Sequence, residues 1–177
     1  MDEHTDPLTR RRAAMLRVNQ AGEYGAARIY AGQLAVMGNR HPAARTIARM
    51  AAQEQRHLDH FNAMIRRRGV RPTLLQPLWS VAGYGLGVAT ALMGPEAAMA
   101  CTAAVETEID KHYDQQLAEL RDEEPELSAA VREFQAEELE HKEAAIAHGA
   151  EQAIGYPVLS AVIRLGCRVA IAASKRI

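Results

Sequence analysis

The sequence contains few cysteines and few aromatic residues. Its 177 residues include two cysteines, five tyrosines, two phenylalanines and one tryptophan. Cys101 and Cys167 lack a C-x-x-C spacing, so a disulfide scaffold and a zinc site are both disfavoured and a reducing compartment is expected. An alanine-rich chain with so few aromatic residues favours closely packed helices over a sheet.

Neither sign of charge dominates the chain, and its beginning carries no apolar run. The formal net charge of −1 gives no general attraction to nucleic acid, so we expect no nucleic-acid partner. Residues 1–7 are acidic, and we expect neither a secretory signal nor an organellar transit peptide. We expect residues 1–8 to be flexible and the whole chain, 1–177, to form one domain with a complete core.

The chain contains two Glu-x-x-His segments, each downstream of a further glutamate. The segments are Glu54–His57 and Glu138–His141, and the upstream glutamates are Glu23 and Glu106. The upstream glutamates are 83 residues apart and the two segments are 84 apart, so the halves of the chain repeat one pattern. Residues i and i+3 share a helix face, so each segment can approach one metal ion from a single turn.

Four carboxylates and two imidazoles on four helices match the ligand set of a two-metal site in a helix bundle. Oxygen and imidazole ligands without a thiolate suit iron or manganese. Two divalent ions would balance the four negative charges, which would otherwise repel one another in an apolar core and be driven toward protonation. One Glu-x-x-His is a weak signal, but two with matched offsets rarely arise by accident. We predict as metal ligands Glu23, Glu54, His57, Glu106, Glu138 and His141.

Prolines and glycines divide the chain into helical segments. We predict helices over residues 9–37, 42–68, 95–121, 125–148 and 156–173, and an apolar crossover segment over residues 72–95. The first two helices form one hairpin, and the helices after the crossover form its repeat. The predicted fold is therefore all-α: a ferritin-like four-helix bundle with a crossover apolar helix and an additional C-terminal helix.

Residues 72–95 carry no charge, and their length approaches that of a membrane span. Pro77 and glycines at 83, 85 and 87 weaken that reading. Arginines at 66, 67, 68 and 71 precede the segment, and Trp79 lies near its start, as in segments that lie on anionic membranes. An interfacial or partly inserted segment, a buried crossover helix and a true span all stay open. The last helix, with Arg164 and Arg168, either caps the bundle or rests on lipid.

Further candidate residues follow from helical spacing. Tyr30 and Tyr113 each lie seven residues after an upstream glutamate and share its face. A relay or substrate contact is one interpretation for each, and core packing with a hydrogen-bonded hydroxyl is the other. Asp110 shares a face with Glu106 and could orient a ligand imidazole, and His148 has a helical spacing from a predicted ligand.

Motifs spread from about Arg17 to the end of the chain carry a family resemblance. They include Ala21-Gly22-Glu23-Tyr24-Gly25-Ala26, Arg71-Pro72-Thr73, Ala104-Val105-Glu106, His112-Tyr113, Glu137-Glu138-Leu139-Glu140-His141 and Gly166-Cys167-Arg168-Val169. With these motifs the chain resembles the demethoxyubiquinone hydroxylases, the di-iron monooxygenases of ubiquinone biosynthesis.

The resemblance implies that two iron ions occupy the six-residue site, bridged by Glu54 and Glu138, with Glu23 and Glu106 terminal. It implies dioxygen-dependent hydroxylation of the ring of a demethoxy polyprenyl quinol. It also implies a peripheral protein on the cytoplasmic face of the inner membrane, in contact with lipid and able to use a lipid-binding partner protein of the same pathway. His112 and Tyr113 resemble a pair that the family uses as a relay in electron transfer. The formation of homo-oligomers stays open.

Three other functions share parts of this pattern. Ferritin-like iron storage needs the same ligands but no apolar path, so the uncharged segment argues against it. A di-iron quinol oxidase shares the site and the substrate class but reduces dioxygen to water, and only a hydroxylated product separates it from a hydroxylase. A non-enzymatic quinone carrier has no need of the full ligand set.

Overall fold

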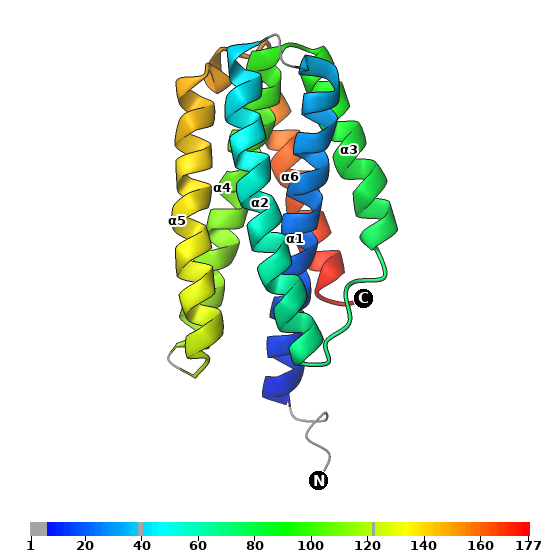
Figure 1. The fold of residues 1–177 in the computed structure, drawn as a ribbon, viewed down its shortest axis with the longest axis vertical. Coiled ribbons are helices and arrows are strands. Elements are labelled where there is room, and N and C mark those ends of the chain that lie inside the picture. Colours follow the sequence, from blue (N-terminus) through cyan, green and yellow to red (C-terminus); the bar gives the residue numbers. More distant parts are fainter. Residues whose placement is uncertain (1–6, 39–40, 122) are drawn as a thin grey trace.

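A computed structural model describes residues 7–38, 41–121 and 123–177. These residues form six α-helices and one short 3-10 helix, and they contain no strand (Figure 1). The helices are α1 (Pro7–Met37), α2 (Pro42–Arg67), α3 (Gln76–Leu92), α4 (Pro95–Leu120), α5 (Pro125–Ala147), η2 (Ala150–Gln152) and α6 (Tyr156–Ser174). The all-α prediction is confirmed. Of the residues 1–8 expected to be flexible, 1–6 lie outside the described ranges, whereas Pro7 and Leu8 open α1.

Proline sets the start of most helices. A proline occupies the first or second position of α2, α3, α4, α5 and α6. Proline is favourable there because its missing N–H would find no partner within the helix, and its fixed φ suits the first turn. At the other end of α5, Gly149 adopts a φ of 86°, a left-handed conformation that commonly ends a helix.

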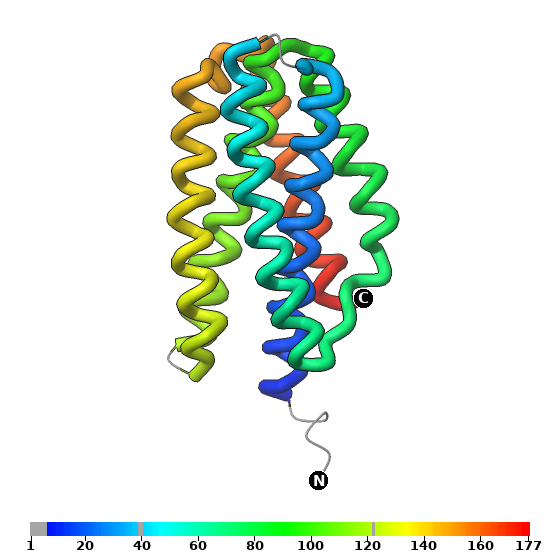
Figure 2. Tube along the Cα trace, viewed as in Figure 1, coloured from blue at the N-terminus to red at the C-terminus, as the bar shows by residue number. Residues whose placement is uncertain are grey.

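Two helix hairpins, α1–α2 and α4–α5, form a four-helix bundle (Figure 2). Two apolar clusters fill the bundle toward its opposite ends. One contains Leu16, Phe61 and Leu127, and the other contains Ile47 and Met99. Along each of the four bundle helices, the predicted metal ligands come between residues of one apolar cluster and residues of the other. The ligands therefore form a polar layer with an apolar layer on each side.

The crossover segment forms α3, which packs along α1 more extensively than any other pair of helices does. The two backbones come very close, because a Cβ built on Gly87 would overlap the carbonyl oxygen of Ile29. The opposite face of α3 is apolar and exposed, with Leu78 at 55% and Val81 at 74% exposure. The segment is therefore not a buried crossover helix: one face contacts the bundle and the other faces outward.

The last helix, α6, lies against α4 and α1. Glu108 on α4 is buried, and its Oε1 lies 2.6 Å from Arg164 Nε and 3.4 Å from Arg168 Nη1. The two arginines thus fasten α6 to the bundle, while Val162 and Val169 remain exposed. Among the described helices, α6 is the one with the length and apolar composition to cross a membrane.

The close approach of α3 and α1 predicts opposite effects for two alanine substitutions. Gly87→Ala should lower the free energy of unfolding by about 1–3 kcal/mol, because the added methyl collides with the α1 backbone. Gly85→Ala on the same helix, with nothing within 4 Å of its Cβ, should raise it by about 0.5–1 kcal/mol. Thermal or denaturant unfolding measures both. Equal changes in the two variants would contradict this packing.

Candidate metal centre

The six predicted ligands meet inside the bundle. They come from all four bundle helices, and each is at most 3% exposed. They are Glu23 on α1, Glu54 and His57 on α2, Glu106 on α4, and Glu138 and His141 on α5. The repeated spacing in the sequence therefore corresponds to one buried cluster.

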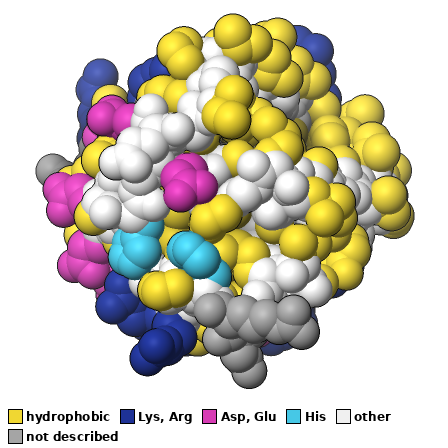
Figure 3. Space-filling model, turned by 90° about the horizontal axis from the view of Figure 1, so that it is seen from above, with side chains coloured by type: hydrophobic (Ala, Val, Ile, Leu, Met, Phe, Trp, Pro, Cys, Tyr) yellow, Lys and Arg dark blue, Asp and Glu magenta, His cyan; other side chains and the backbone are white. Residues whose placement is uncertain are grey.

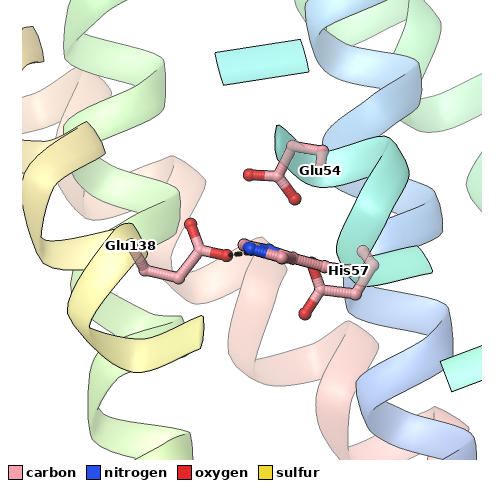
Figure 4. A group of neighbouring side chains, drawn as sticks. Glu54, His57 and Glu138 are labelled. Atoms are coloured by element: carbon pink, nitrogen blue, oxygen red, sulfur yellow. Dashed lines mark hydrogen bonds and ion pairs between the residues drawn. The ribbon is translucent and has the colours of Figure 1, made fainter. Parts of the chain in front are cut away.

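The cluster divides into two overlapping groups. Within each group, ligand atoms lie within 4.8 Å of one another. One group is Glu23, Glu54, His57 and Glu138, and the other is Glu54, Glu106, Glu138 and His141. Glu54 and Glu138 belong to both groups, as two bridging carboxylates would. Figure 4 shows Glu54 on α2 and Glu138 on α5 pointing into the space between their helices, with His57 beside them.

Both histidines direct Nδ1 into the cluster. His57 Nδ1 lies 3.1 Å from Glu138 Oε1 and 3.4 Å from Glu23 Oε2. His141 Nδ1 lies 3.0 Å from Glu138 Oε2 and 3.2 Å from Glu54 Oε1. Each imidazole thus has one ring nitrogen at the centre and the other free to contact residues around it.

The outer ring nitrogens contact two residues that the sequence analysis missed. His57 Nε2 lies 2.8 Å from Glu137 Oε2, and His141 Nε2 lies 3.1 Å from Gln53 Oε1. Asp110, which was expected to orient an imidazole, instead accepts a hydrogen bond from Gln135 Nε2 at 2.8 Å. That expectation is wrong. The missed residues carried a usable signal, because Gln53 and Glu137 are 84 residues apart like the Glu-x-x-His segments.

Two buried tyrosines connect the halves of the repeat. Tyr30 on α1 donates a hydrogen bond to Glu106 Oε1 on α4 at 2.9 Å, and Tyr113 on α4 donates one to Glu23 Oε1 on α1. Each tyrosine therefore holds the upstream glutamate of the other half. Burial and the nearby carboxylates raise the pKa of both tyrosines well above the ordinary value, so both hydroxyls keep their protons.

The buried carboxylates have strongly perturbed acidities without metal. Burial and the neighbouring carboxylates raise the pKa of Glu54 and of Glu106 well above the ordinary value. Burial alone would also raise the pKa of Glu138, but hydrogen bonds with His141 and His57 lower it to about 2. Burial alone would lower the pKa of His57, yet hydrogen bonds with Glu138 and Glu23 raise it to about 10. Protons thus compensate part of the negative charge in the metal-free cluster.

The residues present fit a pair of divalent metal ions. Both carboxylate oxygens of Glu54 are buried, and neither has a well-directed hydrogen-bond donor among the described residues, since His141 Nδ1 at 3.2 Å lies closer to Glu138. Such unsatisfied oxygens are rare inside proteins unless a ligand occupies them. Carboxylate oxygens and imidazole nitrogens are ligands that iron and manganese accept. The buried Glu and His cluster can therefore hold metal.

An apolar cavity of about 350 Å³ lies beside the cluster, between α1, α3, α4 and α6. Glu23 and Tyr113 form part of its wall, which also includes Ala26, Leu86, Val105, Ile163 and Ala170. Trp79 Nε1 on α3 donates a hydrogen bond to Ser174 Oγ on α6 at 3.0 Å, which ties the two outer helices together. The cavity thus connects an apolar space with one edge of the metal centre.

His112 and Asn19 are polar residues in the cavity wall. Gln116 Nε2 lies 2.7 Å from His112 Nε2 and 2.6 Å from Asn19 Oδ1, so one amide holds both. Burial and Lys175 lower the pKa of His112 to about 4, so its imidazole is neutral near pH 7. His148 lies away from the centre: its Nδ1 is 2.8 Å from the carbonyl oxygen of Ala144 at the end of α5.

The helices and their buried side chains define a ferritin-like bundle of the kind that carries two metal ions between four helices. Residues 10–174 match the family described as ubiquinone biosynthesis protein COQ7. The chain belongs to this family, and the resemblance found in the sequence is confirmed.

Named relatives are similar over most of the chain. The chain is 51% identical over 162 residues to the 3-demethoxyubiquinol 3-hydroxylase of Rhodospirillum rubrum, covering 92% of this chain and 76% of that protein. It is 49% identical over 167 residues to the mitochondrial NADPH-dependent 3-demethoxyubiquinone 3-hydroxylase of Homo sapiens, with the same coverage. It is 41% identical over 179 residues to the mitochondrial 5-demethoxyubiquinone hydroxylase of Saccharomyces cerevisiae, covering 92% and 77%.

The perturbed acidities predict how stability depends on pH in the metal-free protein. The pKa of His57 rises from 6.5 to about 10 on folding, so its stabilising contribution is complete below pH 6.5 and is lost as pH approaches 10. Ionisation of Glu54 and Glu106, whose pKa values are raised, also opposes folding at high pH. Thermal unfolding of metal-free protein should therefore show a Tm that falls between about pH 6.5 and 9.

The matched control is His57→Gln, which should have a shallower decline because it lacks the titrating imidazole. Adding Mn²⁺ should oppose the decline, because metal ions compete with protons for the same ligands. A Tm that stays constant or rises with pH in metal-free wild-type protein would contradict the cluster's electrostatics.

Proposed function

We propose that this protein hydroxylates the ring of a demethoxy polyprenyl quinol, using dioxygen and two iron ions. One observation carries the proposal: Glu23 belongs both to the two-group metal cluster and to the wall of the apolar cavity. A ring in that cavity would lie next to the metal centre while its isoprenoid tail contacts apolar side chains. The names of the relatives, which describe hydroxylases of demethoxyubiquinol or demethoxyubiquinone, support this substrate.

The six buried Glu and His residues would hold the iron ions, and Glu54 and Glu138 are the two that belong to both groups. Iron held there would supply coordination positions and electrons for dioxygen activation, and an external donor or the quinol substrate would return those electrons to it. Tyr30 and Tyr113 keep the terminal carboxylates oriented by donating hydrogen bonds to one oxygen of each. The apolar layers at both ends of the bundle exclude water from the centre.

The polar residues in the cavity wall would orient the quinol ring. His112 and Asn19 present hydrogen-bonding groups in an otherwise apolar wall, and Gln116 fixes both. Neutral His112 is able to accept or donate a proton at the cavity wall. Its neighbour Tyr113 donates a hydrogen bond to Glu23 Oε1, and the two rings lie 6.4 Å apart, so the pair would offer a route for electrons from the cavity to a metal ligand.

We further propose that the protein lies on a membrane, on the cytoplasmic face of the inner membrane. The outward faces of α3 and α6 are apolar, and the cavity lies between these helices and the bundle. Seen from above, hydrophobic side chains fill much of the side where α3 lies, and acidic ones gather on the opposite side (Figure 3). A polyprenyl tail could then pass from bilayer to cavity without crossing water. A lipid-binding partner protein or a second copy could share this surface.

The function is tested by quinone mass spectrometry in cells that lack their own enzyme of this kind and accumulate the demethoxy precursor. The wild-type chain should restore the hydroxylated product. Ala170→Phe, which puts a ring into the cavity, should reduce the product-to-precursor ratio by about tenfold, a typical cost of a misfit in an apolar pocket. Ala172→Phe adds the same bulk at an exposed position of α6 and should leave the ratio unchanged.

Each rival function gives a different result in that experiment. A quinol oxidase would consume dioxygen without forming a hydroxylated ring, and an iron-storage protein or a carrier would leave the precursor unchanged. Any of these outcomes with wild-type chain that contains iron would end the hydroxylase proposal.

Membrane binding is tested by flotation with anionic vesicles. The double variant Val81→Glu/Val169→Glu should bind vesicles at least tenfold more weakly, because burying one valine contributes roughly 1.5–3 kcal/mol. Ile146→Glu, at an exposed apolar position on α5, a helix that lies away from α3 and α6, is the control and should bind as wild type does. Equal loss in the control, or no loss in the double variant, would show that the α3 and α6 faces do not contact lipid.

A further inference from the structure

The two halves of the internal repeat differ in a residue that directly precedes each Glu-x-x-His segment. Gln53 directly precedes Glu54 on α2, and Glu137 directly precedes Glu138 on α5. Their side chains contact the outer nitrogens of the histidines from the opposite half, at 3.1 Å for Gln53 and 2.8 Å for Glu137. One histidine is therefore held by a neutral amide and the other by a carboxylate.

The carboxylate is fixed in position by its surroundings. Glu137 Oε2 lies 3.0 Å from Arg56 Nη2, and Gln53 Nε2 donates a hydrogen bond to the same oxygen at 3.5 Å. The position of the repeat that corresponds to Arg56 is Glu140, which is exposed and provides no cation beside Gln53. The two halves thus differ in their outer residues while their six inner ligands match.

This difference has a consequence for metal binding. A ligand imidazole that donates its outer N–H to a carboxylate carries more negative charge on the ring and is a stronger donor to a metal ion. An amide oxygen accepts the same hydrogen bond but brings no net charge. The group that contains His57 should therefore attract a divalent ion more strongly than the group that contains His141.

We propose that the two metal positions are unequal and that Glu137 and Gln53 set the difference. The position formed by Glu23 and His57 takes up the first ion and binds it more tightly, and the position formed by Glu106 and His141 takes up the second. Glu137 and Gln53 act as positioning residues, since each acts on the metal only through a histidine. This inference rests on the di-metal part of the proposed function.

The experiment titrates the metal-free full chain with Mn²⁺ under anaerobic conditions, with a competing chelator. Electron paramagnetic resonance distinguishes an isolated Mn²⁺ from a coupled pair. In wild type, the first equivalent should give mainly the isolated ion and the second should convert it into the pair. Glu137→Gln should weaken the first step by about tenfold and bring the two affinities together, since changing a residue around a ligand costs roughly 10–100-fold in affinity.

The double exchange Gln53→Glu/Glu137→Gln is the decisive variant. It keeps one amide and one carboxylate facing each other and reverses which histidine receives the charge. The two affinities for Mn²⁺ should again be unequal, but the position that contains His141 should now bind the first ion. Added substitutions identify the tight position: His57→Ala should remove the tight step in wild type, whereas His141→Ala should remove it in the exchanged protein. Glu140→Gln, which removes an exposed charge from the same helix, should leave both steps unchanged.

The results separate this inference from the function on which it rests. Two ions bound with equal affinity in wild type, or a ratio of affinities unchanged by Glu137→Gln, would overturn the inequality and leave the hydroxylase proposal standing. A chain that takes up no second ion would overturn both. Circular dichroism of each variant confirms that the helices are intact before its affinities are compared.

Discussion

Four carboxylates placed together inside an apolar bundle are the constraint on which the rest of this structure depends. Each is almost inaccessible to water, so their mutual repulsion is weakly screened and their lost hydration is costly. Metal ions would relieve both costs, and without them protons on the carboxylates and on His57 do so in part. The apolar clusters toward both ends of the bundle hold the four helices against this repulsion.

The hydrogen bonds around the cluster cross from one half of the chain to the other. Tyr30 contacts Glu106 and Tyr113 contacts Glu23, while each histidine contacts a residue of the opposite hairpin. Such crossed contacts make the orientation of each ligand depend on the packing of both hairpins. The site is therefore a property of the assembled bundle, and neither hairpin contains it alone.

The two helices outside the bundle make one side of the molecule different from the other. Both α3 and α6 lie along the α1 and α4 side, where they enclose the apolar cavity and expose apolar faces outward. The α2 and α5 side carries the charged surroundings of the centre, such as Arg56 and Glu137. One side of the cluster thus faces an apolar space suited to a quinol, and the other faces polar residues that contact its histidines.

Sequence alone determined the helices and the six residues of the buried cluster, because helical periodicity, proline starts and the Glu-x-x-His spacing are local properties that the repeat doubled. The family could also be recognised, since its motifs are contiguous. The partners of the histidines could not: Asp110 has the right spacing on its helix, yet Gln53 and Glu137 reach the imidazoles across the bundle. Only tertiary structure decided these contacts, the cavity and the ion pairs of Glu108 with α6. All of them join residues whose distance depends on how helices pack, which no local pattern encodes.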